Sequence, residues 1–242
     1  MRRKIILSAF CSSPPQCVSK NFNICSLWFN QNLNETNSRS GWDSPADLSN
    51  SIRSYYSQGI NGLLTVCSAR QQFQSCLGSS YDVCISELSF LRNGQNLQDS
   101  KAYSAIFKMM EFDCDGGLLQ SVRNWDCILA TESSKNDELT ACGDNFHKQL
   151  ENAPSKLCQY SVEYENCARK FFAAACGAET SWWACERIRR GYSLDELCPS
   201  DTCKIDAPSQ LLPKNQDADA IFSRTPKAAQ VIQELVRMKR NF

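Results

Sequence analysis

Apolar side chains recur at helical spacing through most of residues 44–203. In the clearest stretch, Tyr103, Phe107, Met110 and Cys114 lie four, three and four residues apart, which places them on one face of an α-helix. Helix caps, first-turn prolines and glycine stops divide the rest into similar segments, and none alternates in the manner of a strand. The pattern predicts an all-α fold.

Changes in composition predict three parts of the chain. Residues 1–43 are expected to be an irregular segment that begins with a short possible leader, and residues 44–203 a cysteine-rich helical domain. Within that domain, residues 131–138 are expected to form a polar loop. Residues 204–242 are expected to be a linker followed by a separate C-terminal amphipathic helix that begins at Thr225-Pro226. The apolar face of this last helix holds Val231, Ile232, Leu235 and Met238.

The 15 cysteines among 242 residues change the picture most. Zinc modules place ligands two to four residues apart and usually add histidines, but this chain has no C-x-x-C and His147 is its single histidine. Zinc binding and thioredoxin-like redox chemistry are therefore disfavoured, and structural disulfides remain. Because disulfides persist in oxidising compartments, the sequence predicts a secreted, extracellular protein.

The N-terminus bears on which cysteines pair. Arg2-Arg3-Lys4 and the apolar run that follows resemble a signal peptide in order but not in length. An odd number of cysteines cannot pair completely, and removal of a leader that ends at or just beyond Cys11 leaves 14. The predicted half-cystines are Cys17, Cys25, Cys67, Cys76, Cys84, Cys114, Cys127, Cys142, Cys158, Cys167, Cys176, Cys185, Cys198 and Cys203.

A nine-residue interval separates several neighbouring cysteines. Nine residues correspond to half a turn out of phase on an α-helix and to about 13 Å along its axis, beyond the ~7 Å that a disulfide can span. Cys67 therefore cannot pair with Cys76, nor Cys158 with Cys167, if these segments are helical. Each such helix must be bonded to two different neighbours, which predicts a disulfide-stapled layered helical bundle.

Charge and hydropathy exclude some partners. The 26 basic and 26 acidic residues balance, so no broad field for nucleic acid is expected, and no stretch has the ~18 apolar residues of a membrane span. The clusters of basic residues at 187–190 and 237–240 resemble dibasic processing sites, but solvated helix faces are the favoured interpretation of both. Binding of a sulfated polysaccharide by Arg187, Arg189 and Arg190 stays open as an alternative.

The order of nine cysteines resembles that of a nematode secreted domain, catalogued as domain of unknown function 19. It is similar to the order in insect 27 kDa hemolymph glycoproteins and, more loosely, in nematode chondroitin proteoglycan 4-like proteins. The resemblance covers about residues 60–200 and implies an extracellular, helical, disulfide-bonded domain without an assigned reaction. It rests on Cys67, Cys76, Cys84, Cys114, Cys127, Cys142, Cys158, Cys167 and Cys176.

Few residues suggest chemistry. The chain has no G-x-S-x-G, P-loop, G-x-G-x-x-G or H-E-x-x-H motif. His147 is expected at the surface, because Cys142, the nearest cysteine, points elsewhere on the same helix. Glu111, Asp113 and Asp115 could form an acid pair or a calcium site, but a solvated helix end is favoured because the spacing of a calcium loop is absent.

Three hypotheses about function follow. The first is a non-enzymatic extracellular binding or matrix protein, without metal or cofactor, whose partner is an unknown extracellular protein or glycan. Its sequon Asn34-Glu35-Thr36 would carry N-linked glycan. The second is a carrier that holds a small hydrophobic ligand between helices near Trp182 or near Phe171 and Phe172, although core packing is favoured for Trp182 and Trp183. The third is a hydrolase that uses acidic residues.

Overall fold

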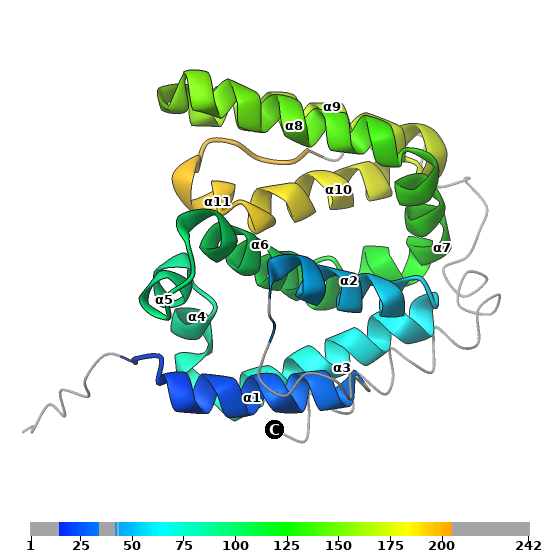
Figure 1. The fold of residues 1–242 in the computed structure, drawn as a ribbon. Helices are drawn as coiled ribbons and strands as arrows, with labels where there is room; N and C mark the ends of the chain where they lie inside the picture. Colours follow the sequence, from blue (N-terminus) through cyan, green and yellow to red (C-terminus); the bar gives the residue numbers. More distant parts are fainter. Residues whose placement is uncertain (1–14, 34–41, 43, 205–242) are drawn as a thin grey trace, which may run out of the picture.

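The computed structural model describes residues 15–33, 42 and 44–204, and most of these residues are in helices (Figure 1). Two short 3-10 turns, η1 (Gly78–Ser80) and η2 (Pro154–Lys156), join helices. The α-helices are α1 (Ser19–Asn32), α2 (Pro45–Tyr56), α3 (Ile60–Leu77), α4 (Tyr81–Cys84), α5 (Glu87–Arg92), α6 (Leu97–Cys114), α7 (Leu118–Ser134), α8 (Asn136–Asn152), α9 (Leu157–Cys176), α10 (Ala178–Gly191) and α11 (Leu194–Leu197).

Local sequence explains where several helices begin. Ser44 precedes Pro45 at the first position of α2, and its hydroxyl accepts a hydrogen bond from the backbone N–H of Asp47. Ser86 and Asn96 cap α5 and α6 in the same way. These side chains satisfy backbone donors that a helix start would otherwise leave without partners.

The helices are arranged in layers (Figure 1). Helices α1 and α3 pack together at one side, α6 lies on α3, α10 lies on α6, and α9 followed by α8 forms the opposite side. Helix α2 covers α3 and α6, whereas α7 runs along one end and connects the middle layers to α8. This arrangement confirms the all-α, layered bundle that the sequence predicts.

Aromatic side chains fill the space between the first three layers. Phe73 of α3 stacks on Phe107 of α6 with ring centroids 5.4 Å apart, and Phe29 of α1 meets Phe73 edge to face at 5.8 Å. Trp42 packs on Phe107 at 5.3 Å. A second cluster, in which Phe146 of α8 stacks on Tyr164 of α9, lies between the outer helices. Burial of these rings supplies much of the apolar contact that holds the layers together.

Two sequence expectations about irregular structure are wrong. Residues 19–32 form α1 although the segment 1–43 is expected to be irregular, because Cys25 and Phe29 are buried against α3. The expected polar loop at 131–138 is instead helical on both sides of a turn at Lys135. The polar residues of this stretch lie largely at the solvent-exposed end of α7 and the solvent-exposed start of α8. Asn34, Cys11 and the expected C-terminal helix lie outside the described residues.

All fourteen expected half-cystines are paired in the structure. Helix α3 is bonded to α1 on one side and to α6 on the other, and neither Cys67–Cys76 nor Cys158–Cys167 forms. This agrees with the argument from the nine-residue interval. The seven bonds are Cys17–Cys84, Cys25–Cys76, Cys67–Cys114, Cys127–Cys176, Cys142–Cys167, Cys158–Cys198 and Cys185–Cys203.

The bonds fall into two sets that do not cross. Three of the bonds join cysteines within residues 17–114, which we call the N-terminal unit. The other four join cysteines within residues 127–203, which we call the C-terminal unit. With Cys185–Cys203 set aside, each unit has six cysteines, and in both the first pairs with the fifth, the second with the fourth and the third with the sixth.

The repeated pairing is informative because six cysteines allow 15 connectivities. The central helices agree as well, since the third and fourth cysteines of each unit lie nine residues apart on one helix: Cys67 and Cys76 on α3, and Cys158 and Cys167 on α9, which also ends with Cys176. The chain is therefore built from two units with the same disulfide plan. The junction between them, centred on the packing of α6 against α10, has no covalent cross-link among the described residues.

Candidate functional site

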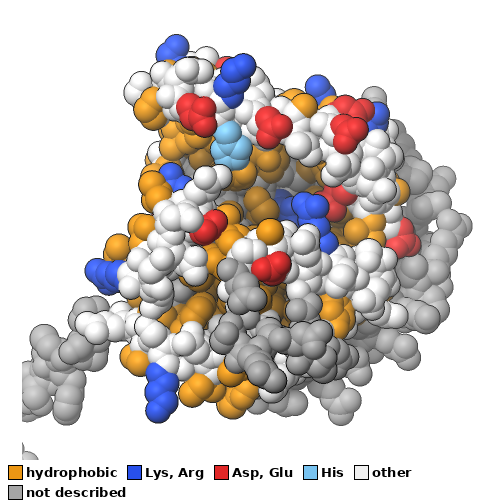
Figure 2. Space-filling model, viewed as in Figure 1, with side chains coloured by type: hydrophobic (Ala, Val, Ile, Leu, Met, Phe, Trp, Pro, Cys, Tyr) orange, Lys and Arg blue, Asp and Glu red, His pale blue; other side chains and the backbone are white. Residues whose placement is uncertain are grey.

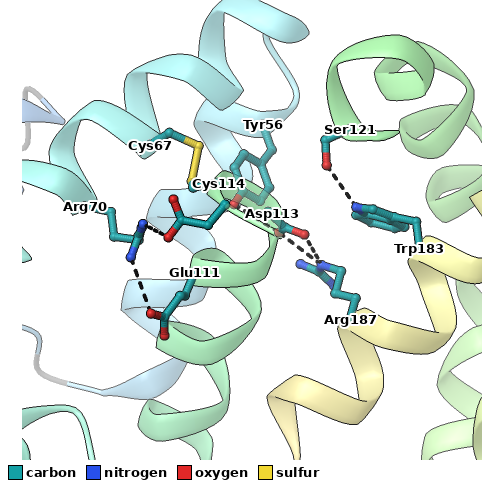
Figure 3. Close-up of a disulfide and its surroundings, with 10 residues drawn as sticks. Tyr56, Cys67, Arg70, Glu111, Asp113, Cys114, Ser121, Trp183 and Arg187 are labelled. Atoms are coloured by element: carbon teal, nitrogen blue, oxygen red, sulfur yellow. Dashed lines mark hydrogen bonds and ion pairs between the residues drawn. A yellow bond between two sulfur atoms is a disulfide. The ribbon is translucent and has the colours of Figure 1, made fainter. Parts of the chain in front are cut away.

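A buried ion pair lies at the junction between the two units (Figure 3). Asp113 of α6 is fully buried, and Arg187 of α10 donates from Nε to both carboxylate oxygens at 2.9 and 3.0 Å. Tyr56 of α2 donates its hydroxyl to Asp113 Oδ2 at 3.2 Å. The carboxylate therefore has partners from two elements outside its own helix, which offsets the penalty of burying its charge.

Burial governs the acid–base behaviour of this group. It raises the pKa of Asp113 to about 6, although Arg187 opposes the increase. Burial and the neighbouring Asp113 also raise the pKa of Tyr56 well above its usual value, so Tyr56 remains a neutral hydrogen-bond donor. Both carboxylate oxygens of Asp113 are engaged by Arg187, and one of them also by Tyr56, which is typical of a structural ion pair and not of a catalytic acid.

The other two acids of the 111–115 cluster face a different helix. Arg70 of α3, which is itself buried, pairs with Glu111 at 3.8 Å and with Asp115 (Figure 3). Asp113 instead points toward α10, so the three carboxylates do not share a site for calcium or an acid pair. The favoured expectation of a solvated helix end is wrong for Asp113, because α10 covers the last turn of α6.

A hollow of about 910 Å³ opens between α4–α5, α6 and the α10–α11 corner. Its lining thus comes from both units. The apolar part of the wall is Ile85, Leu88, Phe112, Trp182 and Leu197. The charged part is Asp82, Glu87, Glu111, Asp115, Glu186, Glu196, Lys108 and Arg190.

Acidic groups dominate the rim of this hollow. Lys108 crosses the junction between the units to Ser193 Oγ at 2.6 Å and to Glu196 at 3.6 Å. Glu186 pairs with Arg189 at 3.2 Å and with Arg190 at 3.7 Å, and Arg70 pairs with Glu111 and Asp115 from behind the wall. No ion pair involving Asp82 or Glu87 is found among the residues that the structure describes. The hollow therefore has an apolar floor and a surplus of negative charge.

A third polar centre surrounds Glu165 on α9. Its side chain is only 3% exposed, and one carboxylate oxygen lies 3.4 Å from Cys185 Sγ, within the Cys185–Cys203 disulfide. Burial, and then the neighbouring Asp201, raises the pKa of Glu165 to about 8. Glu165, Cys185 and Cys203 are close enough to bind a metal ion, but sulfurs already joined in a disulfide are not thiolate ligands.

The candidate residues for nucleophilic chemistry are not brought together. His147 is exposed and its Nε2 lies 3.4 Å from the hydroxyl of Tyr192. Cys142, the nearest cysteine along α8, is bonded to Cys167 and offers no thiol. Among the described residues, every cysteine is in a disulfide, so no cysteine nucleophile is available there.

The aromatic residues expected near a ligand separate into different environments. Trp183 is buried and donates from Nε1 to Ser121 Oγ at 2.9 Å (Figure 3), whereas its neighbour Trp182 is half-buried and lines the hollow. Phe172 packs against Trp183 in the core. Phe171 lies on another face, with Lys170 Nζ 4.8 Å from its ring centroid. Of these residues, only Trp182 lines the hollow.

The basic cluster of α10 is not the solvated face that the sequence favours. Arg187 is engaged by Asp113, and Arg189 pairs with Glu186 and donates to the backbone oxygen of Asp201. Helix α10 lies between α6 and α9, so charged side chains on several of its faces meet other elements. Sequence periodicity alone could not reveal the burial of Arg187 against Asp113, because Asp113 is on another helix.

The visible surface carries basic and acidic side chains mixed together (Figure 2). No helix among the described residues has the length and apolarity needed to cross a bilayer. No family model, curated protein or solved structure matches this chain.

Proposed function

We propose that this chain is a secreted, non-enzymatic protein that acts outside the cell by binding a protein or glycan, or as a matrix component. The observation that supports it most is the complete pairing of fourteen cysteines in seven bonds. Disulfides in this number are typical of proteins from oxidising compartments. The buried carboxylate of Asp113 is engaged by Arg187 and Tyr56, which argues against its use as the acid of the third hypothesis, a hydrolase.

The relation to the nematode domain of unknown function 19 remains part of this proposal. The nine cysteines that carry the resemblance are all half-cystines here, and the residues around them are helical. A glycan at Asn34 also belongs to the proposal, since the sequon would be modified only in a secreted chain.

Carriage of a small hydrophobic ligand is the second candidate function, and the hollow favours it. Its volume of about 910 Å³ lies within the ~300–1,000 Å³ that is typical of small-molecule sites. Phe112 and Trp182 contribute aromatic surface to its wall. The acidic rim is less suited to a neutral lipid, because charged groups would lose water on closure.

The primary proposal is tested by measuring intact mass of the protein from its natural source before and after reduction. We expect alkylation of the fourteen half-cystines only after reduction, and loss of additional mass on enzymatic removal of N-linked glycan. Free thiols at most of these positions in the native protein would contradict secretion.

The carrier alternative is tested by native mass spectrometry of gently purified protein. A bound small molecule that is lost in Trp182→Ala, but kept in Trp28→Ala, would support carriage, because Trp28 is exposed on α1 away from the lining of the hollow. Unliganded wild-type protein would count against it.

A further inference from the structure

Two large apolar side chains stand exposed on opposite walls of the hollow. Leu88 of α5 is 54% exposed and Leu197 of α11 is 59% exposed. The half-buried ring of Trp182 and the side chains of Ile85 and Phe112 continue the apolar surface between them. Contiguous exposed apolar surface with a polar rim is characteristic of binding sites.

The rim specifies the charge of the occupant. Six carboxylates and two cations line the hollow, and even after the flanking Arg70 and Arg189 are counted, the acids are in excess. This excess corresponds to Asp82 and Glu87, which have no ion pair among the described residues. An occupant that presents an apolar face flanked by positive charge would therefore be complementary to the hollow.

We propose that the hollow binds the C-terminal segment of the same chain, residues 225–242. This inference goes beyond the proposed extracellular role and does not depend on it. In sequence, the segment is amphipathic, with Val231, Leu235 and Met238 spaced four and three residues apart. Such a pattern suits insertion of a helix face into an apolar groove.

The charge of the segment matches the rim. Residues 225–242 carry four basic side chains, Lys227, Arg237, Lys239 and Arg240, against the single acid Glu234. Lys227 precedes the apolar positions, Arg237 and Lys239 lie on either side of Met238, and Arg240 follows them. The long aliphatic stems of these residues allow their charges to reach carboxylates at the edge while the apolar positions contact the floor.

The segment can also reach the hollow. Cys203 is bonded to Cys185 of α10 and lies beside Glu165 of α9, so the described chain ends on the α9 side of α10, across that helix from the hollow. The 20 residues from 205 to 224 precede the segment. A chain of that length can extend to at most about 70 Å, which is enough to pass around α10 to the hollow.

Docking would have a structural consequence at the junction. The walls belong to α4–α6 of the N-terminal unit and to α10–α11 of the C-terminal unit. A bound segment would therefore contact both units where no disulfide joins them. Its binding would hold the two units together without a covalent bond. This binding would be stronger at low ionic strength, because salt screens the attraction between the charges of the segment and those of the hollow.

Hydrogen exchange of the full chain tests the proposal. The variant Arg237→Glu/Lys239→Glu/Arg240→Glu reverses the charge of the segment without altering the described fold. We expect amides of residues 85–92 and 190–198 to exchange about fivefold or more faster in this variant than in the wild type, because the hollow loses its cover. A carbodiimide, which joins lysines directly to carboxylates, should link Lys227 or Lys239 to Asp82 or Glu87 in the wild-type monomer.

Two further variants make the test specific. Lys20→Glu/Arg53→Glu/Lys148→Glu makes the same change in net charge on α1, α2 and α8 and should leave exchange at the hollow unchanged. Adding Asp82→Lys/Glu87→Lys to the charge-reversed segment should restore protection. Equal exchange in wild type and segment variant, or a co-purified small molecule that protects the hollow in both, would overturn the proposal.

Discussion

Asp113 and Arg187 form a buried ion pair that joins α6 to α10 across the junction between two disulfide-closed units. Their contact at 2.9 Å links residues 74 positions apart in sequence. Because no disulfide crosses this junction among the described residues, the pair and the surrounding rings of Tyr56, Trp125 and Trp183 hold the units together. The stability of the whole fold should therefore be sensitive to this one contact.

Removing one partner of the ion pair should strongly destabilise the protein. Arg187→Met leaves the fully buried carboxylate of Asp113 without a counter-charge, and we expect the free energy of unfolding to fall by about 3 kcal/mol. Chemical denaturation monitored by tryptophan fluorescence measures the change. The double variant Asp113→Asn/Arg187→Met should lose less than the sum of the two single variants, because the uncompensated charge is gone.

An exposed ion pair provides the control. Arg123 of α7 and Glu179 of α10 pair near the junction, at 3.3 Å, but both side chains are substantially open to solvent. Arg123→Gln should lower stability by less than about 1 kcal/mol. Equal losses for Arg187→Met and Arg123→Gln would show that the buried pair has no special role at the junction.

Stability should decrease as pH rises through the neutral range. Glu165 has an ordinary pKa of 4.5 but titrates at about 8 in the fold, so the folded state holds a proton that the unfolded state has lost between these values. Its contribution is fully present below pH 4.5 and is lost as pH approaches 8, by an amount on the order of 4 to 5 kcal/mol. Burial also raises the pKa of Asp113, to about 6, so the stability that its protonated form contributes is lost as pH rises toward 6.

Glu165→Gln isolates this effect. Glutamine keeps the shape of a protonated carboxyl but does not ionise, so the variant should lose less stability than the wild type between pH 5 and pH 8.5. Denaturant titrations at three pH values within this range provide the comparison. Parallel pH curves for the two proteins would exclude titration of Glu165 as the cause.

The Cys185–Cys203 bond should be less important than the bonds that the two units share. It closes the shortest loop, with a sequence separation of 18, whereas Cys17–Cys84 closes one of 67. Loop-closure entropy predicts losses of about 3 kcal/mol for the pair Cys185→Ser/Cys203→Ser and about 4 kcal/mol for Cys17→Ser/Cys84→Ser. Thermal unfolding of both variants measures the order, and the reverse order would contradict this assignment.

Cysteine spacing predicted more of the fold than any other feature of the sequence. The nine-residue interval in α3 and α9 excludes pairing within a helix and places α3 between two bonded neighbours, as the structure has it. The partners themselves could not be deduced, because they depend on how helices distant in sequence pack. The shared pairing order of the two units becomes visible only once those partners are known.

The polar and charged residues were harder to interpret. Asp113 lies at a helix end rich in acids, which is typical of a solvated position, and only the packing of α10 buries it. Helix α1 has no side-chain cap, and it is held against α3 by the burial of Cys25 and Phe29. The acidic hollow combines residues from both units, and no local pattern in the sequence indicates it.

Mass-spectrometric mapping of disulfide-linked peptides from the unreduced protein tests the account most directly. We expect seven linked pairs. Cys17–Cys84, Cys25–Cys76 and Cys67–Cys114 in the N-terminal unit correspond in order to Cys127–Cys176, Cys142–Cys167 and Cys158–Cys198 in the C-terminal unit, and Cys185–Cys203 is the seventh pair. No linked peptide should join residues 17–114 to residues 127–203. A bond across that boundary, or fourteen free thiols, would contradict the two-unit architecture.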